Sequence, residues 1–249
     1  MSFTSIFSKF SSIGRSKNTI NNFKLYQKLF RKKSGLEIGG PSKFFRKVVP
    51  IYNTIKSLDG VNFSSSTIWE GDLAEGTNYK FTKRRKGYQF ICDAINLDRI
   101  DSCKYDFILS CNNLEHTANP LKAINEWLRV IKQNGLIVLV LPNKDSNFDH
   151  NRSITSFEHL LEDFNNNTTE DDLTHFEEIL SLHDLTLDPL AGDFEQFKQR
   201  SINNIQNRCL HQHVFDMNLL ELIFLHFNIE LVLSNSTPND FIIVGRKTV

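Results

Sequence analysis

The sequence predicts an α/β fold, a Rossmann-like and mostly parallel sheet with helices on both faces. Strand-like and helix-like segments alternate between residues 34 and 141, as in strands joined by right-handed helical crossovers. Residues 136–141 are all apolar, which is typical of a strand in the middle of a parallel sheet. Residues 35–40 form a short, mostly apolar run that ends in a Gly-Gly pair, which predicts a buried first strand followed by a tight turn.

The other elements follow from local patterns. Apolar residues at helical spacing within 121–131 predict an amphipathic helix, and Gly135 is the expected stop after it. The second strand is expected to end near Asp59 and the third on Asp93. In chain order, the expected strands are residues 35–40, 55–63, 89–93, 105–110 and 136–141 and a terminal hairpin of 229–233 and 241–244, with helices or turns at 42–48, 121–131 and 219–227.

Two segments differ from this core. Residues 1–33 contain basic but no acidic side chains, and we expect them to form a helical cap on a domain of residues 34–249. A membrane-surface anchor or a targeting segment is the alternative, which we do not favour. Residues 143–216 are polar and weakly periodic, which predicts a long polar and helical insertion that serves binding. The apolar side chains that share one helical face near the N-terminus are Phe3, Ile6, Phe7 and Phe10.

Composition narrows the classes of function. The 249-residue chain has 29 basic and 29 acidic side chains and a net charge of zero, so no global field attracts nucleic acid. The one basic cluster, near the N-terminus, has few aromatic residues to stack on bases, so we expect no nucleic-acid partner. The longest apolar run, 136–141, is far too short to span a bilayer. Four cysteines without a CxxC pair predict free thiols in a reducing cytoplasm.

Candidate ligand-binding residues follow the predicted strands. In open α/β sheets ligands bind beyond the carboxyl ends of the strands, which places Glu37, Asp59, Asp93 and residues 110–116 around one crevice. A carboxylate there accepts hydrogen bonds from ammonium or hydroxyl groups, and glycines let the backbone approach a ligand closely. Each residue also has a structural interpretation: a tight strand-to-helix turn at Glu37, a turn aspartate at Asp59 and a helix N-cap at Asp93.

One combination of motifs is more specific than its parts. Residues 36–40 read LEIGG, Asp93-Ala94 follows the third strand, residues 113–116 read NLEH, and 127–135 read WLRVIKQNG before a strand that ends in Leu141-Pro142. This order and spacing resembles the class I S-adenosylmethionine-dependent methyltransferases, and most of all their type 11 subgroup. The resemblance covers roughly residues 34–143.

The resemblance implies S-adenosylmethionine as cofactor and assigns roles to residues. Glu37 would contact the amino-acid portion of the cofactor, Asp59 the ribose, and the third-strand acid the adenine. The full set of implied cofactor-binding residues is Glu37, Gly39, Gly40, Asp59, Asp93, Ala94, Asn112 and Asn113.

Two departures bear on the function. Pro41 and Lys43 stand where the family has further glycines, which fits the alternative of a non-catalytic, methyltransferase-like binding or partner module. An NAD-dependent enzyme on the same sheet is not expected, because no GxGxxG pattern follows the first strand.

Methyl transfer to a hydroxyl group requires a general base, and histidine is a usual choice. We expect an acceptor that is a small molecule or a glycan, with a sugar hydroxyl of a surface glycan suggested by the wider resemblance around residues 174–175 and 213–216. No metal is expected, because no compact ligand motif such as HExxH occurs. If no histidine serves as base, Asp145 or Glu158 is the alternative. The candidate catalytic histidines are His116, His150, His175, His211 and His213.

Overall fold

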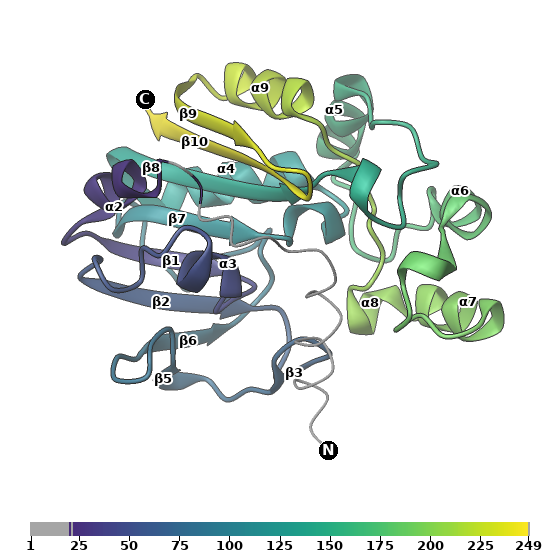
Figure 1. Ribbon diagram of the computed structural model, residues 1–249, viewed down its shortest axis with the longest axis horizontal. Helices are drawn as coiled ribbons and strands as arrows, with labels where there is room; N and C mark the ends of the chain where they lie inside the picture. Colours follow the sequence, from purple (N-terminus) through teal and green to yellow (C-terminus); the bar gives the residue numbers. More distant parts are fainter. Residues whose placement is uncertain (1–19, 21, 249) are drawn as a thin grey trace.

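An eight-stranded sheet forms the centre of the molecule in the computed structural model, which describes residue 20 and residues 22–248 (Figure 1). The strand order is β5-β6-β2-β1-β7-β8-β10-β9. The strands of this sheet are β1 (Ser34–Ile38), β2 (Ser57–Asn62), β5 (Gly76–Tyr79), β6 (Gly87–Ile91), β7 (Tyr105–Cys111), β8 (Ile131–Pro142), β9 (Ile229–Ser236) and β10 (Asp240–Lys247).

The sheet is mostly parallel, as predicted. Strands β6, β2, β1, β7 and β8 pair in parallel, while β5 at one edge and the β9–β10 hairpin at the other run antiparallel. Counted along the chain, the parallel strands lie in the order third, second, first, fourth, fifth, which is the Rossmann arrangement. The terminal hairpin is confirmed. The short strands β3 (Ser66–Thr67), β4 (Gly71–Asp72) and β5 were not predicted.

Helices cover both faces of the sheet. In β8, odd-numbered residues 137–141 pack with α4 and α9, and even-numbered residues 136–140 pack with α2 and α3. This strand is therefore buried on both sides, as its unbroken apolar run predicts. The helices are α2 (Phe23–Phe30), α3 (Lys43–Lys47), α4 (Pro120–Val130), α5 (Phe157–Asn166), α6 (Phe176–Leu182), α7 (Phe194–Ile202), α8 (Asn204–Asn207) and α9 (Met217–His226).

Helix α4 fixes one side of the strand ends. It starts at Pro120. The preceding residue, Asn119, is its N-cap, and the Asn119 side chain accepts a hydrogen bond from the Lys122 backbone N–H at 3.0 Å. The buried Trp127 donates its indole N–H to the Ala94 carbonyl at 2.9 Å. This bond ties the helix to the loop that follows β6, so the loop keeps a defined position at the sheet edge.

Of residues 1–33, which the sequence predicts to form a cap, the structure describes residue 20 and residues 22–33. Helix α2 buries Tyr26 and Phe30, and the Phe30 ring lies 5.1 Å from the Phe107 ring of β7. The apolar helical face predicted for Phe3, Ile6, Phe7 and Phe10 falls outside the described residues. No helix in the described part of the chain is long and apolar enough to span a bilayer.

The segment 143–216 contains helices α5 to α8 and the 3-10 turns η2 (Lys144–Ser146) and η3 (Leu185–Leu187). It leaves the sheet at the end of β8, and Figure 1 shows α6, α7 and α8 gathered beside one end of the strands. A small apolar cluster of its own holds its outer half together. The fully buried members of this cluster are Ile179, Ala191, Phe197 and Leu210.

Candidate methyl-transfer site

The carboxylate of Glu37 is completely buried at the end of β1. It accepts hydrogen bonds from the hydroxyls of Tyr52 (2.6 and 2.7 Å) and Tyr79 (2.6 Å) and from the Ser42 backbone N–H (3.0 Å). Burial raises the pKa of Glu37, and the two tyrosine hydrogen bonds oppose that rise. These bonds tether the chain after β1 to two neighbouring segments, so Glu37 shapes the turn from inside the protein.

The two glycines after Glu37 are required by close side-chain approaches. Gly39 has φ of +73°, and a Cβ there would lie 2.6 Å from Asn113 Nδ2. A Cβ on Gly40 would lie 2.4 Å from both the Glu37 carboxyl carbon and the Tyr79 hydroxyl. The backbone of this turn is thereby brought against Asn113 at the exit of β7.

Asn113 presents an unused acceptor at the same place. Its Oδ1 is buried and has no hydrogen-bond partner within the protein. The preceding residue, Asn112, is exposed and has φ of +48°, which turns the chain sharply after β7. A buried, unpaired carbonyl oxygen is costly, so this position is suited to a donor supplied by a ligand.

The prediction that the second strand ends near Asp59 is wrong. Asp59 lies three residues before the end of β2, opposite Leu36. Its carboxylate accepts bonds from the Tyr88 backbone N–H (2.8 Å) and the Tyr105 hydroxyl (2.7 Å). The position at the strand end belongs to Asn62, a buried residue whose side-chain N–H donates to the Gly40 carbonyl at 3.2 Å.

Asp93 lies two residues beyond the end of β6, so the prediction that the third strand ends on it is wrong by two residues. Its Oδ1 accepts from the Ile95 backbone N–H at 3.1 Å; this bond caps a turn, so the alternative of a helix N-cap is wrong. Its Oδ2 lies 2.8 Å from an Arg208 guanidinium nitrogen, and Arg208 also pairs with Glu170 at 2.6 Å. The insertion is therefore joined to the strand-three exit by an ion pair.

The ribbon of β3 and β4 brings two more side chains to this edge. The Trp69 ring lies 5.3 Å from the ring of His116. Next to it, burial raises the pKa of Glu70 to about 7, helped by the charge of Glu37 and opposed by Arg46 and Lys43.

Two buried carboxylates and two partly buried histidines meet where β7 exits, and we call Glu115, His116, Asp149 and His211 the acceptor-side cluster. The rings of His116 and His211 lie 4.6 Å apart, and one ligand atom from each of Glu115, His116 and His211 falls within 4.8 Å of the others. His116 Nδ1 lies 3.0 Å from the Leu210 carbonyl, and His211 Nδ1 bonds to Asp149 Oδ2. Both carboxylate oxygens of Glu115 are buried without a hydrogen-bond partner.

The pKa values of the groups in this cluster are shifted in opposite directions. Burial lowers the pKa of His116 to about 3, and the charge of His211 adds to the effect. Burial also lowers the pKa of His211, but the charge and hydrogen bond of Asp149 outweigh it and the net shift is upward. The pKa of Asp149 falls to about 2, because His211 and Arg152 outweigh its burial. Asp149 is therefore ionised, and its bond requires that His211 Nδ1 carries a proton.

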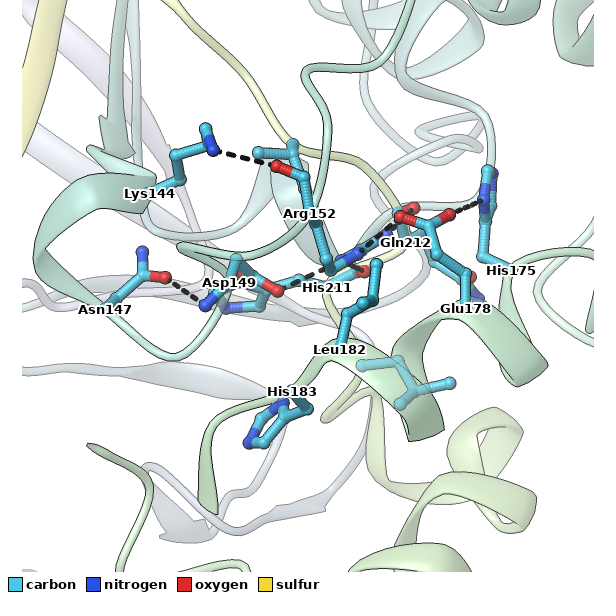
Figure 2. Close-up of polar contacts among 12 residues, drawn as sticks. Lys144, Asn147, Asp149, Arg152, His175, Glu178, Leu182, His183, His211 and Gln212 are labelled. Carbon is cyan, nitrogen blue, oxygen red and sulfur yellow. Dashed lines mark hydrogen bonds and ion pairs between the residues drawn. The ribbon is translucent and has the colours of Figure 1, made fainter. Parts of the chain in front are cut away.

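Arg152 holds Asp149 in place. It is 2% exposed, and its guanidinium donates to Asp149 Oδ1 (3.1 Å), to Glu178 Oε1 (3.0 Å) and to the backbone carbonyls of His211 (2.7 Å) and Gln212 (3.2 Å). Figure 2 shows Arg152 between Asp149 on one side and Glu178 on the other. A planar guanidinium supplies several fixed donors, which suits this position.

The other predicted histidines lie elsewhere. His150 bonds to Asp184 Oδ2 at 3.0 Å and belongs to neither of the histidine groups found among the described residues. His175 and His213 meet His159, with one ring nitrogen of each within 4.8 Å of the others. The five histidines predicted as catalytic candidates thus fall into three places, of which one adjoins the strand-end edge.

Solved methyltransferases share this architecture. A methyltransferase of Haloferax volcanii, solved in complex with a methyltransferase activator, has a TM-score of 0.54 at 11% identity, with 99% of this chain and 98% of that chain covered. A SAM-dependent methyltransferase of Thermotoga maritima has a TM-score of 0.51 at 15% identity, with 98% and 96% covered. One of Aquifex aeolicus has a TM-score of 0.51 at 10% identity, with 98% of each chain covered. These likenesses show the fold.

A family model described as a methyltransferase domain matches residues 54–139, the stretch from β2 to β8. Over these residues the chain matches the methyltransferase-domain family, and its fold is that of the class I methyltransferases. Its cofactor is S-adenosylmethionine. Among curated protein sequences, none matches this chain.

Several residues of these sites were missed as candidates, and three of them show why. Asn62 was hidden by the wrong end of the second strand, and Asp149 lacked a local motif because its partner His211 is 62 residues away. His159 had a usable signal: Asp163 follows it by four residues, which places both on one face of a helix.

Proposed function

We propose that this methyltransferase transfers a methyl group to a hydroxyl of a small molecule or carbohydrate, with His211 as the general base. The hydrogen-bonded pair of Asp149 and His211, beside the exit of β7, carries the proposal. Methyl transfer needs a nucleophile held in line and a dry site, and a hydroxyl nucleophile also needs its proton removed.

The sheet edge fits the cofactor. Asn113 Oδ1 is an unpaired buried acceptor beside the turn at Gly39, so it suits the ammonium group of the amino-acid portion. Asp93 and Ala94 lie at the third-strand exit, where the family resemblance puts the adenine. Glu37 would act indirectly, through the shape of its turn, because its carboxylate is already bonded to two tyrosines and a backbone N–H. When bound, the cofactor supplies an activated methyl group.

His211 has the geometry of an oriented base. Asp149 accepts the proton on Nδ1, which leaves Nε2 as the ring nitrogen able to take a proton from an acceptor hydroxyl. His116 is held in the same cluster by the Leu210 carbonyl, and its low pKa keeps it neutral. It positions the acceptor or its proton without adding a charge to the site.

Aromatic rings flank the cluster, which supports a carbohydrate acceptor. Trp69 lies 5.3 Å from the ring of His116, and Phe148 lies 4.6 Å from the ring of His211. Flat apolar faces next to hydrogen-bonding groups suit a sugar ring, with its C–H face and its hydroxyls. A surface-glycan sugar is the acceptor class that we favour.

The four cysteines, all free, support a cytoplasmic location.

The test is a screen of sugar and small-molecule acceptors with labelled S-adenosylmethionine, followed by comparison of two histidine variants. His211→Asn should lower turnover by about 10²–10⁴-fold with cofactor affinity little changed, because it removes the base and keeps the cofactor edge. His150→Asn is the matched control, since His150 also bonds to an aspartate but lies outside the cluster, and it should keep its turnover.

Two results would count against the proposal. Equal turnover in the two variants would remove His211 from the reaction. Cofactor binding without transfer to any acceptor of the panel would favour a non-catalytic binding module instead.

A further inference from the structure

We propose that the insertion binds a divalent metal ion, Zn²⁺ by the chemistry of its ligands, between His159, His175, His213 and Asp163. We call these four residues the tri-histidine site. It is separate from the acceptor-side cluster, and the proposal does not depend on the methyl-transfer reaction.

Three histidines converge from three segments, with one ring nitrogen of each within 4.8 Å of the others, and Asp163 lies beside two of them. His159 and Asp163 stand one turn apart on α5, His175 is the N-cap residue of α6, and His213 lies in the extended segment before α9. The Nε2 atoms of His159 and His175 are 2.8 Å apart. Asp163 Oδ2 lies 3.3 Å from His159 Nε2 and 3.6 Å from His213 Nε2.

The protein leaves acceptor atoms of this group without partners. His213 is 2% exposed; its Nε2 donates to the Ala118 carbonyl at 3.2 Å, so its Nδ1, which has no hydrogen-bond partner, is the nitrogen left to bind a cation. Asp163 Oδ2 is buried and accepts no hydrogen bond, although it lies 3.3 Å from His159 Nε2. Such atoms are costly in a protein interior. A cation that accepts lone pairs from the imidazoles and the carboxylate removes this cost.

A carboxylate behind one of the histidines also matches the surroundings of metal sites. His175 Nδ1 lies 3.4 Å from Glu178 Oε2, while the other oxygen of Glu178 accepts from Arg152 Nε at 3.0 Å. Figure 2 shows this chain of contacts from His175 through Glu178 to Arg152. A histidine that ligates a metal typically donates its second ring N–H to such a carboxylate, which fixes the ring and its tautomer.

The ligand set selects the metal. Three imidazole nitrogens and one carboxylate oxygen match a tetrahedral Zn²⁺ site, and four protein ligands leave no open position for substrate. The ion would therefore be structural. It joins three segments of an insertion whose own fully buried apolar cluster has only four members among the described residues, so a metal crosslink would add stability that packing does not provide.

The experiment measures metal content, with no cofactor or acceptor present. The full chain is stripped with a chelator, dialysed against Zn²⁺, and analysed by elemental mass spectrometry; Co²⁺ is loaded in parallel as a spectroscopic probe. We expect about one Zn²⁺ per chain and, with Co²⁺, the intense visible absorption of a tetrahedral site.

Variants assign the site. His175→Ala should lose stoichiometric Zn²⁺, and Glu178→Gln should weaken binding about 10–100-fold, because it removes only the outer carboxylate. His150→Ala, a histidine of the same insertion outside the site, should keep the ion. Far-UV circular dichroism checks that each variant is folded, and the Co²⁺ spectrum of the unmodified protein needs no variant.

His211→Ala separates this site from the acceptor-side cluster, whose ligand atoms also converge. Loss of Zn²⁺ in His211→Ala with retention in His175→Ala would put the ion in the acceptor-side cluster and overturn the proposal. A wild-type chain that binds no Zn²⁺ and gives no tetrahedral Co²⁺ spectrum would overturn it as well.

Discussion

Replacing Arg152 by Met tests whether burial sets the strength of an ion pair in this protein. Arg152 and Asp149 lie 3.1 Å apart with side chains 1% and 4% exposed. Arg246 and Glu230 on the terminal hairpin are also 3.1 Å apart, but 34% and 56% exposed. The two pairs have the same separation and differ in solvation, so Arg246→Met is a matched control.

The expected magnitudes differ severalfold. Arg152→Met leaves the Asp149 carboxylate buried with one hydrogen-bond partner fewer and takes the donor from two backbone carbonyls, which should cost about 3–5 kcal/mol. Arg246→Met removes a solvated pair and should cost about 0–1 kcal/mol. Arg152→Lys should recover only part of the loss, since an ammonium cannot supply the same planar set of donors.

Urea unfolding followed by circular dichroism at neutral pH gives the free energy of unfolding of each variant. The reasoning fails if Arg152→Met and Arg246→Met lose the same stability. It also fails if Arg152→Lys is as stable as the wild type, because charge alone would then be sufficient.

Three further predictions concern the cofactor edge. Burial raises the pKa of Glu70 to about 7 from its ordinary value of 4.5, so between these pH values the folded state binds a proton that the unfolded state does not, and stability falls as pH rises through that window. Glu70→Gln removes this group and should make the free energy of unfolding less pH-dependent by about 1–2 kcal/mol. An unchanged dependence of the unfolding free energy on pH would contradict this. Asn113→Ala should weaken cofactor binding by about 1–3 kcal/mol in calorimetry while unfolding stability stays nearly constant, since Oδ1 has no partner in the protein; equal affinity would remove it from the site. Gly39→Ala should cost about 1–2 kcal/mol of stability from its positive φ, more if Asn113 cannot move aside, and a neutral effect on unfolding would show that the turn relaxes.

The sheet was predictable because its signals are local. The apolar run of β8 and the Gly39-Gly40 turn each indicate one element, and their alternation with helices fixes the parallel topology. The end of β2 was not predictable in this way. Asp59-Gly60 has the composition of a turn, but Gly60 lies inside the strand. Glycine is required there because a Cβ would come within 2.2 Å of the Tyr79 ring. That contact joins residues nineteen positions apart, and no local pattern reports it.

The candidate site was predictable at its β7 exit and less so in the insertion. The motif at residues 113–116 follows a strong strand signal, so His116 could be placed at the sheet edge. The grouping of His211 with Asp149, and of His213 with His159, depends on how the insertion folds back, which its weak periodicity does not encode. The sequence therefore supplied the histidines but not their partners.

The segment from Leu210 to His213 limits how far this insertion can be moved between proteins. Its histidines alternate, with His211 toward the acceptor-side cluster and His213 toward the tri-histidine site, while His116 and Ala118 of the parent domain contact Leu210 and His213. The insertion is therefore not a structurally independent unit, because its last residues contact the loop after β7. A graft onto another methyltransferase scaffold would have to carry the loop after β7 together with residues 143–216. One residue added between the two histidines would turn one ring away from its partners, so recombination at this point is far less tolerated than at the exposed turns of the insertion.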